Sequence, residues 1–390
     1  MHLLHEADRA RVAADDSAPI AARAVRWIVI MQHGIRCALM RGGTSKGAYF
    51  LASDLPADPA ARDALILSVM GSPDPRQVDG LGGAHPLTSK IAIVSRSDAP
   101  GVDIDFLFGQ VALDKPVVDF TPNCGNILSG VAPFAIERGL IQATSPLTRV
   151  KVRTVNTGTI AELSVETPEG RVRYAGVARI DGAPGTAAPI VIDFLDTEGS
   201  VCGSLLPTGK LVDRVAGVDV TLIDNGMPVI VIAASAVGRT GHEPRDQLNA
   251  DKALKARLEE IRLAAGPLMN LGDVRDKVVP KICLVAAPAN NGAIATRSFI
   301  PHECHASIGV FAAVTVATAC VLPGSPAALL ANVPEGRDKL LAIEHPSGVF
   351  DVRIAVGGAP DHPVVERAGL LRTARMLFDG VAYPREIVAA

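Results

Sequence analysis

The segment that most constrains the fold is a nearly continuous apolar run at residues 127–136. Its apolar members are Ile127, Leu128, Val131, Ala132, Phe134, Ala135 and Ile136. A helix that is apolar around its whole circumference is buried rather than laid on a surface. The run therefore predicts a central helix wrapped by several strands. Pro133 predicts a kink within it, and Gly139 predicts its end.

Cys124 stands directly before this helix, in the run Asn123-Cys124-Gly125-Asn126. Unpaired N–H groups and the helix dipole favour negative charge there, so they favour the thiolate and can also bind a carboxylate. Lys90 leads into an apolar strand at residues 91–94. A lysine before a strand is usually structural, and a lone buried cysteine is usually packing. Together, an amine, a thiol and an anion site suggest proton transfer on an acid.

A glycine-rich turn at residues 41–47 follows a predicted strand at 35–40 and precedes another at 48–51. It carries Arg41, Thr44, Ser45 and Lys46. Its spacing is not that of a phosphate-binding Walker loop. The turn is either a tight connection with surface charges or a clamp for a carboxylate. Further strands are predicted at 102–113, 117–120, 150–166 with a turn at 156–158, 172–177 and 190–194, and a capped helix at 58–71.

The second half of the chain repeats this plan. Strands are predicted at 218–223, 229–233 and 281–285, with Met227 in the turn that replaces the Arg41 turn. A charged helix at 251–265 should stop at Gly266. Lys281 echoes Lys90, and Cys304 is predicted to open a second apolar helix that ends at Cys320. Residues 370–375 echo 177–180. The repetition predicts a duplicated α+β fold with a small-molecule site between pseudo-symmetric lobes.

The predicted boundaries are 34–205 for the first lobe, which the C-terminal strand is a candidate to join, and 206–390 for the second. Residues 1–33 look like an arm or an over-extended start. The 390 residues suit two domains. A net charge of −3 without a basic block argues against nucleic acid, and no apolar run could span a membrane. Six scattered cysteines argue against zinc and disulfides and fit a reducing cytoplasm.

Several motifs together resemble the family of 2-methylaconitate cis–trans isomerases and 4-oxalomesaconate tautomerases, which has the diaminopimelate epimerase-like fold. They are Met40 to Gly47, Gly71 to Asp74, Asp79 to Gly83, Thr88-Ser89-Lys90, Asn123 to Asn126 and Leu206 to Gly209. The resemblance covers residues 34–390. Residues 87–90 and 127–139 are more similar to the tautomerase branch.

This resemblance implies that Lys90 and Cys124 are a catalytic pair facing each other across the substrate. Desolvation and neighbouring cations would favour the neutral amine of Lys90. The substrate-binding residues it implies or allows are Arg41, Thr44, Ser45, Ser89, Asn123, Gly125, Asn126, Met227, Lys281, Arg297, Ser298 and His302.

The implied reaction is a 1,3-allylic proton shift in an unsaturated tricarboxylate such as 4-oxalomesaconate, as in the breakdown of aromatic acids. It needs no metal and no cofactor, and the resemblance allows a homodimer. One alternative is isomerisation of 2-methylaconitate. Another is a non-catalytic protein that binds polycarboxylates or a partner enzyme. A third is a two-thiol epimerase, in which Cys304 would face Cys124; without a one-residue gap, Glu303 takes that position.

Overall fold

The computed structural model describes residues 34–359 and 362–385, so the predicted arm at residues 1–33 lies outside the described residues. Its helices are α1 (Pro59–Met70), α2 (Gly125–Leu128), α3 (Val131–Glu137), α4 (Arg245–Ala250), α5 (Lys252–Leu268) and α6 (Val310–Cys320). Within these described ranges no helix is long and apolar enough to cross a membrane.

The strands form one continuous 16-stranded sheet. The first eight are β1 (Ile35–Gly42), β2 (Ser45–Leu51), β3 (Lys90–Arg96), β4 (Ile104–Val111), β5 (Val118–Asp119), β6 (Leu147–Thr154), β7 (Ile160–Glu166) and β8 (Pro189–Leu195). The others are β9 (Asp213–Val215), β10 (Val218–Asp224), β11 (Pro228–Ala233), β12 (Lys281–Ala286), β13 (Ile294–Phe299), β14 (Asp338–His345), β15 (Gly348–Ala359) and β16 (His362–Ala382).

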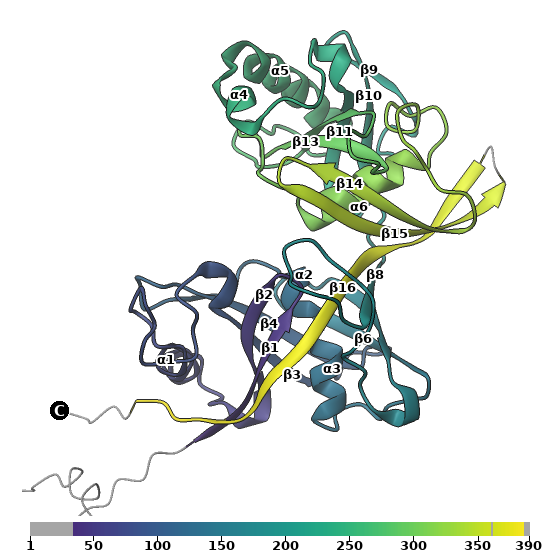
Figure 1. The fold of residues 1–390 in the computed structure, drawn as a ribbon. Helices are drawn as coiled ribbons and strands as arrows, with labels where there is room; N and C mark the ends of the chain where they lie inside the picture. The colour runs from purple at the N-terminus through teal and green to yellow at the C-terminus, as the bar shows by residue number, and fades with distance from the viewer. Residues whose placement is uncertain (1–33, 360–361, 386–390) are drawn as a thin grey trace, which may run out of the picture.

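The strand pairing confirms the predicted duplication. From β1 through β2, β3, β4, β6, β7 and β8, the contacts are antiparallel, parallel, antiparallel, parallel, antiparallel and antiparallel. From β10 through β11, β12, β13, β14, β15 and β16, the same six kinds of contact recur in the same order. Each half therefore builds one strand-wrapped lobe (Figure 1).

Alternating side chains divide each lobe into two layers. On β3, Ala92 and Val94 join the large core that contains α2, α3 and α6. Ile91 and Ile93 face the other way, into the core beneath α1. Strand β12 likewise has one face in the large core around α6 and its other face in the core beneath α5. Because successive side chains of a strand point to opposite faces, each sheet is buried on both sides.

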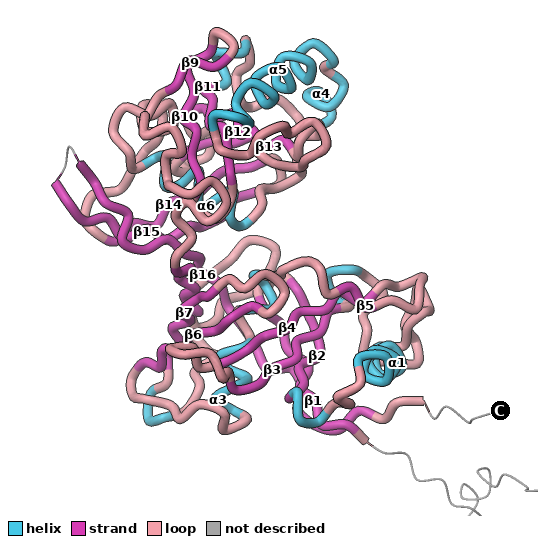
Figure 2. Tube along the Cα trace, turned by 180° about the vertical axis from the view of Figure 1, so that it is seen from behind, coloured by secondary structure: helices cyan, strands magenta, loops and turns pink. Residues whose placement is uncertain are grey.

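Strand β16 links the two lobes (Figures 1 and 2). Its first half pairs with β15, its middle with β8, and its second half, from Ala374 to Ala382, with β1. The second half of β16 is thus a strand of the first lobe. The boundary at residues 205 and 206 stays a prediction.

The predicted central helix of the first lobe is two short helices. The chain breaks at Ser129 and Gly130, before Pro133. The predicted proline kink is therefore wrong. Pro133 is the third residue of α3, where a backbone N–H has no helical partner to lose. Gly139, with φ of +70°, ends this helix as predicted.

Three further expectations differ from the structure. Residues 172–177 form a loop rather than a strand. In this loop Gly176 packs against the backbone of Ala188 so closely that a Cβ would not fit. Helix α5 continues through Gly266 to Leu268, since that glycine gives close packing against Val274 rather than a helix end. The second apolar helix begins after Gly309, well beyond Cys304.

The buried hydroxyl of Tyr49 connects α2 to β2 by donating to the Ile127 carbonyl oxygen at 2.6 Å. Replacing Tyr49 with Phe should lower the free energy of unfolding by about 1 kcal/mol, because a buried hydrogen bond is lost while the ring stays. Urea unfolding measures this loss. The matched change Tyr383→Phe, at a 61% exposed residue, should have no effect. Equal midpoints for both variants would show that the contact adds no stability.

Candidate active site

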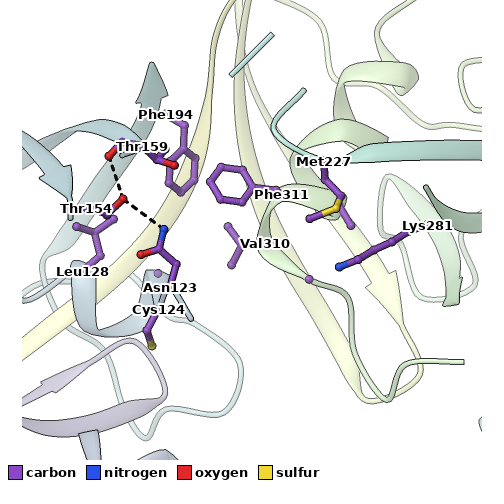
Figure 3. A pocket seen from close by; sticks show the side chains of 13 residues that line it. Asn123, Cys124, Leu128, Thr154, Thr159, Phe194, Met227, Lys281, Val310 and Phe311 are labelled. Atoms are coloured by element: carbon purple, nitrogen blue, oxygen red, sulfur yellow. Dashed lines mark hydrogen bonds between the residues drawn. The ribbon is translucent and has the colours of Figure 1, made fainter. Parts of the chain in front are cut away.

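A cavity of about 210 Å³ lies between the two lobes (Figure 3). The first lobe contributes Asn123, Cys124, Gly125, Leu128, Thr154, Thr159 and Phe194, and the second contributes Met227, Lys281, Gly309, Val310, Phe311 and Ala312. Phe194 and Phe311 close one side, with ring centroids 4.6 Å apart. Five of the predicted site residues, from both halves of the sequence, therefore share one cavity.

Cys124 caps the N-terminus of α2, as predicted, with extended backbone angles. The other five cysteines are buried. Burial raises the pKa to about 11 at Cys37 and Cys304 and to about 12 at Cys202 and Cys320, and it raises the pKa of Cys283 further. Cys124 alone is partly exposed. It is therefore the thiol that a ligand in the cavity can reach.

Asn123 precedes this thiol and is fixed by the turn after β6. Its side-chain amide donates to Thr157 Oγ1 at 2.7 Å and to Thr154 Oγ1 at 3.3 Å. Its buried Oδ1 has no hydrogen-bond partner among the described residues. This side chain can therefore accept one more hydrogen bond.

Lys281 enters the cavity from the second lobe, on the opposite side from Cys124 (Figure 3). Burial lowers its pKa. It opens β12 beside Val229 of β11, just as Lys90 opens β3 beside Gly47 of β2. The echo between the two lysines that the sequence suggested is thus a structural equivalence.

Arg41, Thr44 and Ser45 line a second cavity of about 530 Å³ within the first lobe. Asn126 lines neither cavity, but its side-chain amide donates to Thr44 Oγ1 at 2.9 Å and to Ser45 Oγ at 3.5 Å. The turn after β1 and the start of α2 therefore form one unit, which carries Arg41 on one side and Cys124 on the other.

Lys90 lines neither cavity. It is 8% exposed, donates from Nζ to Gln110 Oε1 at 2.5 Å, and lies 5.2 Å from the centre of the Phe108 ring. It shares the face of β3 that carries Ala92, which packs in the core around α2. Its side chain thus lies on the same face of the sheet as the Cys124 helix. Ser89 is fully buried and donates to Gln77 Oε1 at 2.6 Å.

The remaining predicted residues of the second half lie outside both cavities. Arg297 donates from Nε to the Glu243 carbonyl at 2.8 Å, and burial lowers its pKa. Ser298 is buried, and its hydroxyl has no partner within the described part of the chain. His302 lies on an exposed loop, 3.6 Å from Glu259. Their contact with substrate stays a prediction.

The sequence missed the aromatic and β-branched lining around Val310 and Phe311. The sequence placed the start of the second apolar helix at Cys304, whereas the structure makes Gly309 the cap of α6 and hence the counterpart of Cys124. Cys304 is instead buried in the core beneath α5, and its backbone forms an isolated antiparallel β-bridge with Phe299. No thiol therefore stands at the tip of α6, which removes the structural basis of the two-thiol alternative.

Fold and cavity together define a two-lobed α+β protein whose site is shared between duplicated halves. The chain belongs to the PrpF protein family, whose pattern matches residues 32–385. A crystal structure of a methylitaconate-delta-isomerase, 36% identical, superposes with a TM-score of 0.80 over 90% of this chain and 96% of that one. The predicted fold class, α+β and diaminopimelate epimerase-like, is confirmed.

Two curated relatives are more similar in sequence. The (4E)-oxalomesaconate Delta-isomerase of Novosphingobium sp. (strain KA1) is 60% identical over 347 residues, which cover 89% of this chain and 96% of the relative. The 4-oxalomesaconate tautomerase of Pseudomonas putida is 57% identical over 350 residues, which cover 90% and 96%. The family and branch suggested by the sequence motifs are therefore confirmed.

The burial of the cysteines predicts a single fast-reacting thiol. Iodoacetamide should modify Cys124 first and leave the five buried thiols unmodified in the folded protein, because alkylation needs an accessible thiolate. Peptide mass spectrometry of briefly treated protein identifies the site. The variant Cys124→Ser should show no fast labelling. Fast labelling at Cys304 instead would contradict the assigned burial.

Proposed function

We propose that this protein is an isomerase that moves a proton across an allylic system in 4-oxalomesaconate or a closely related unsaturated tricarboxylate. The observation that carries the proposal is its match to two relatives named for 4-oxalomesaconate, at 60% and 57% identity over 96% of their length. The relatives named 3-methylitaconate isomerase and 2-methyl-aconitate isomerase are more distant, at 37% and 36% identity. Isomerisation of 2-methylaconitate is therefore the less favoured alternative.

Lys90 and Cys124 are the proposed catalytic pair. Support comes from their common side of the first-lobe sheet and from the partial exposure of Cys124. The amine of Lys90 contacts a neutral amide and an aromatic ring, and no ion pair joins it to an acid among the described residues. The amine is therefore not held in a salt bridge with a carboxylate from the described part of the chain.

In the proposed reaction the substrate loses a proton from one carbon and gains a proton at another. One member of the pair removes a proton from the carbon next to the conjugated system. The electron pair spreads into the keto group and carboxylates, and the other member delivers a proton to the far allylic carbon. The double bond shifts, and no electrons enter or leave. Because no redox step or group transfer occurs, we propose a reaction independent of cofactor and metal.

The substrate carboxylates need cations and N–H donors. We propose that Asn123, Gly125 and Asn126 bind one carboxylate beside Cys124, and that the developing enolate meets the same N–H groups. Met227 and Lys281 would contact the substrate from the second lobe, where both line the shared cavity. Ser89, Arg297, Ser298 and His302 stay predicted substrate-binding residues, although none of them lines either cavity.

We place this reaction in the catabolism of aromatic acids, in the cytoplasm, where unpaired cysteines remain reduced. A homodimer is also proposed, and size-exclusion chromatography with light scattering would measure it.

Turnover of 4-oxalomesaconate beside 2-methylaconitate tests the proposal, followed by proton NMR in D₂O. The wild-type protein should favour the first substrate and place deuterium at the far allylic carbon. Lys90→Met and Cys124→Ser should each lower kcat by about 10²-fold or more, since each removes a proton-transfer group. The exposed lysine variant Lys115→Met should keep wild-type rates.

Three results would contradict the proposal. The wild-type protein could fail to turn over either acid, which would leave a non-catalytic binder. Full activity in both Lys90→Met and Cys124→Ser would remove the catalytic pair. Deuterium at a stereocentre, with no movement of the double bond, would indicate epimerisation instead.

A further inference from the structure

The second cavity is strongly cationic. Arg41, Lys46 and Arg375 line it, and no acidic side chain does. Its remaining polar lining comes from hydroxyl groups, which are those of Thr44, Ser45, Thr88, Tyr174 and Thr186. The cavity, of about 530 Å³, is bounded by the turn after β1, the loop over residues 174–187 and the second half of β16.

The three cations are direct neighbours across three strands. Arg41 of β1 lies opposite Lys46 of β2 on one side and opposite Arg375 of β16 on the other. Side chains at such paired positions have Cβ atoms about 5 Å apart, and like charges there destabilise the sheet. We call Lys46, Arg41 and Arg375 the cationic row.

Nothing within the described ranges neutralises this row. Arg41 donates from Nη1 to the carbonyl oxygens of Gly43 and Thr373 and to Thr373 Oγ1, at 2.8, 3.1 and 2.9 Å. Each acceptor is uncharged. No ion pair to Lys46 or Arg375 occurs among the described residues either, although many other arginines of the chain have one. Burial and then repulsion from Arg375 lower the pKa of Arg41.

We propose that the cationic row binds the carboxylates of a di- or tricarboxylate at the end remote from the reacting carbons, with Arg375 as its specificity-determining residue. The proposal rests on the proposed function, because the same substrate would reach Cys124. Asn126 connects the two ends, since its amide donates to Thr44 in the cationic cavity while Cys124 and Gly125 line the other.

This assignment predicts opposite effects on stability and on binding. Without ligand, Arg375→Gln should raise the unfolding temperature, because it relieves repulsion within the row. The same change should weaken binding of tricarballylate, a saturated tricarboxylate that the enzyme cannot isomerise, by tenfold or more. A purely structural arginine would lower stability when removed. Lys46→Gln should repeat both effects from the other side of Arg41.

Isothermal titration calorimetry with tricarballylate, and with butyrate as a monocarboxylate, measures binding. The control Arg36→Gln removes an exposed arginine of the same strand β1 and should bind tricarballylate as the wild type does. Butyrate should bind weakly to every form. The inference is overturned if Arg375→Gln and Lys46→Gln bind tricarballylate with wild-type affinity, or if both unfold at lower temperature.

The outcome also separates this inference from the proposed function. If the wild type does not isomerise 4-oxalomesaconate but both row variants lose tricarballylate binding, the anion site stands and the proposed substrate falls. If turnover is present and both row variants keep wild-type affinity, the reaction stands and the cationic row falls.

Discussion

The contact between the start of α2 and the turn after β1 positions the first-lobe part of the candidate site. Asn126 donates to Thr44 and Ser45, and the backbone around it lies directly against Gly42 and Gly43. A Cβ on Gly42 would come within 2.3 Å of the Asn126 carbonyl oxygen, and one on Gly43 within 2.1 Å of its side-chain oxygen. Only glycine allows this approach, and Gly43 also has φ of +53°. The glycines of the turn thus place a thiol beside a cationic pocket.

The duplicated lobes share a scaffold but differ at their tips. Lys90 and Lys281 occupy equivalent strand starts, whereas Cys124 caps α2 and Gly309 caps α6. Each lobe can bury its helix with the same strand order, so the repetition serves stability. The departures from symmetry fall at the helix tips, in the crevice between lobes where ligands are expected to bind. A single thiol suits a reaction in which the proton returns to a different carbon.

Local signals in the sequence predicted local structure well. Asp58, Pro59 and Gly71 marked both ends of α1 because caps act through neighbouring backbone groups. The alternation of apolar and polar residues that predicted β4 and the apolar character of α2, α3 and α6 were equally direct. Cys124 could be predicted as the cap of α2 because the apolar run after it required a buried helix. The break at Gly130 had no such local signal, and the close contact of Gly130 with the Tyr49 hydroxyl, which leaves no room for a Cβ, appears only in the structure.

The sequence alone could not predict which distant strands pair with each other. Arg375 is far from Arg41 in the chain, and only the path of β16 back into the first lobe brings them opposite each other. The site residue Phe311 was missed for a related reason, because the start of α6 was placed at Cys304. Residues whose role depends on which strands meet therefore required the structure, while residues whose role depends on their immediate neighbours did not.

A crystal structure of the Cys124→Ser variant with tricarballylate tests the central claim most directly. The account predicts one ligand beside residues 123–126, with one carboxylate near the backbone of Gly125 and another contacting Arg41 or Arg375. It also predicts that the amine of Lys90 and the side chain of residue 124 both lie within a few ångströms of the ligand carbons. A ligand bound elsewhere, or one that Lys90 cannot reach, would contradict it.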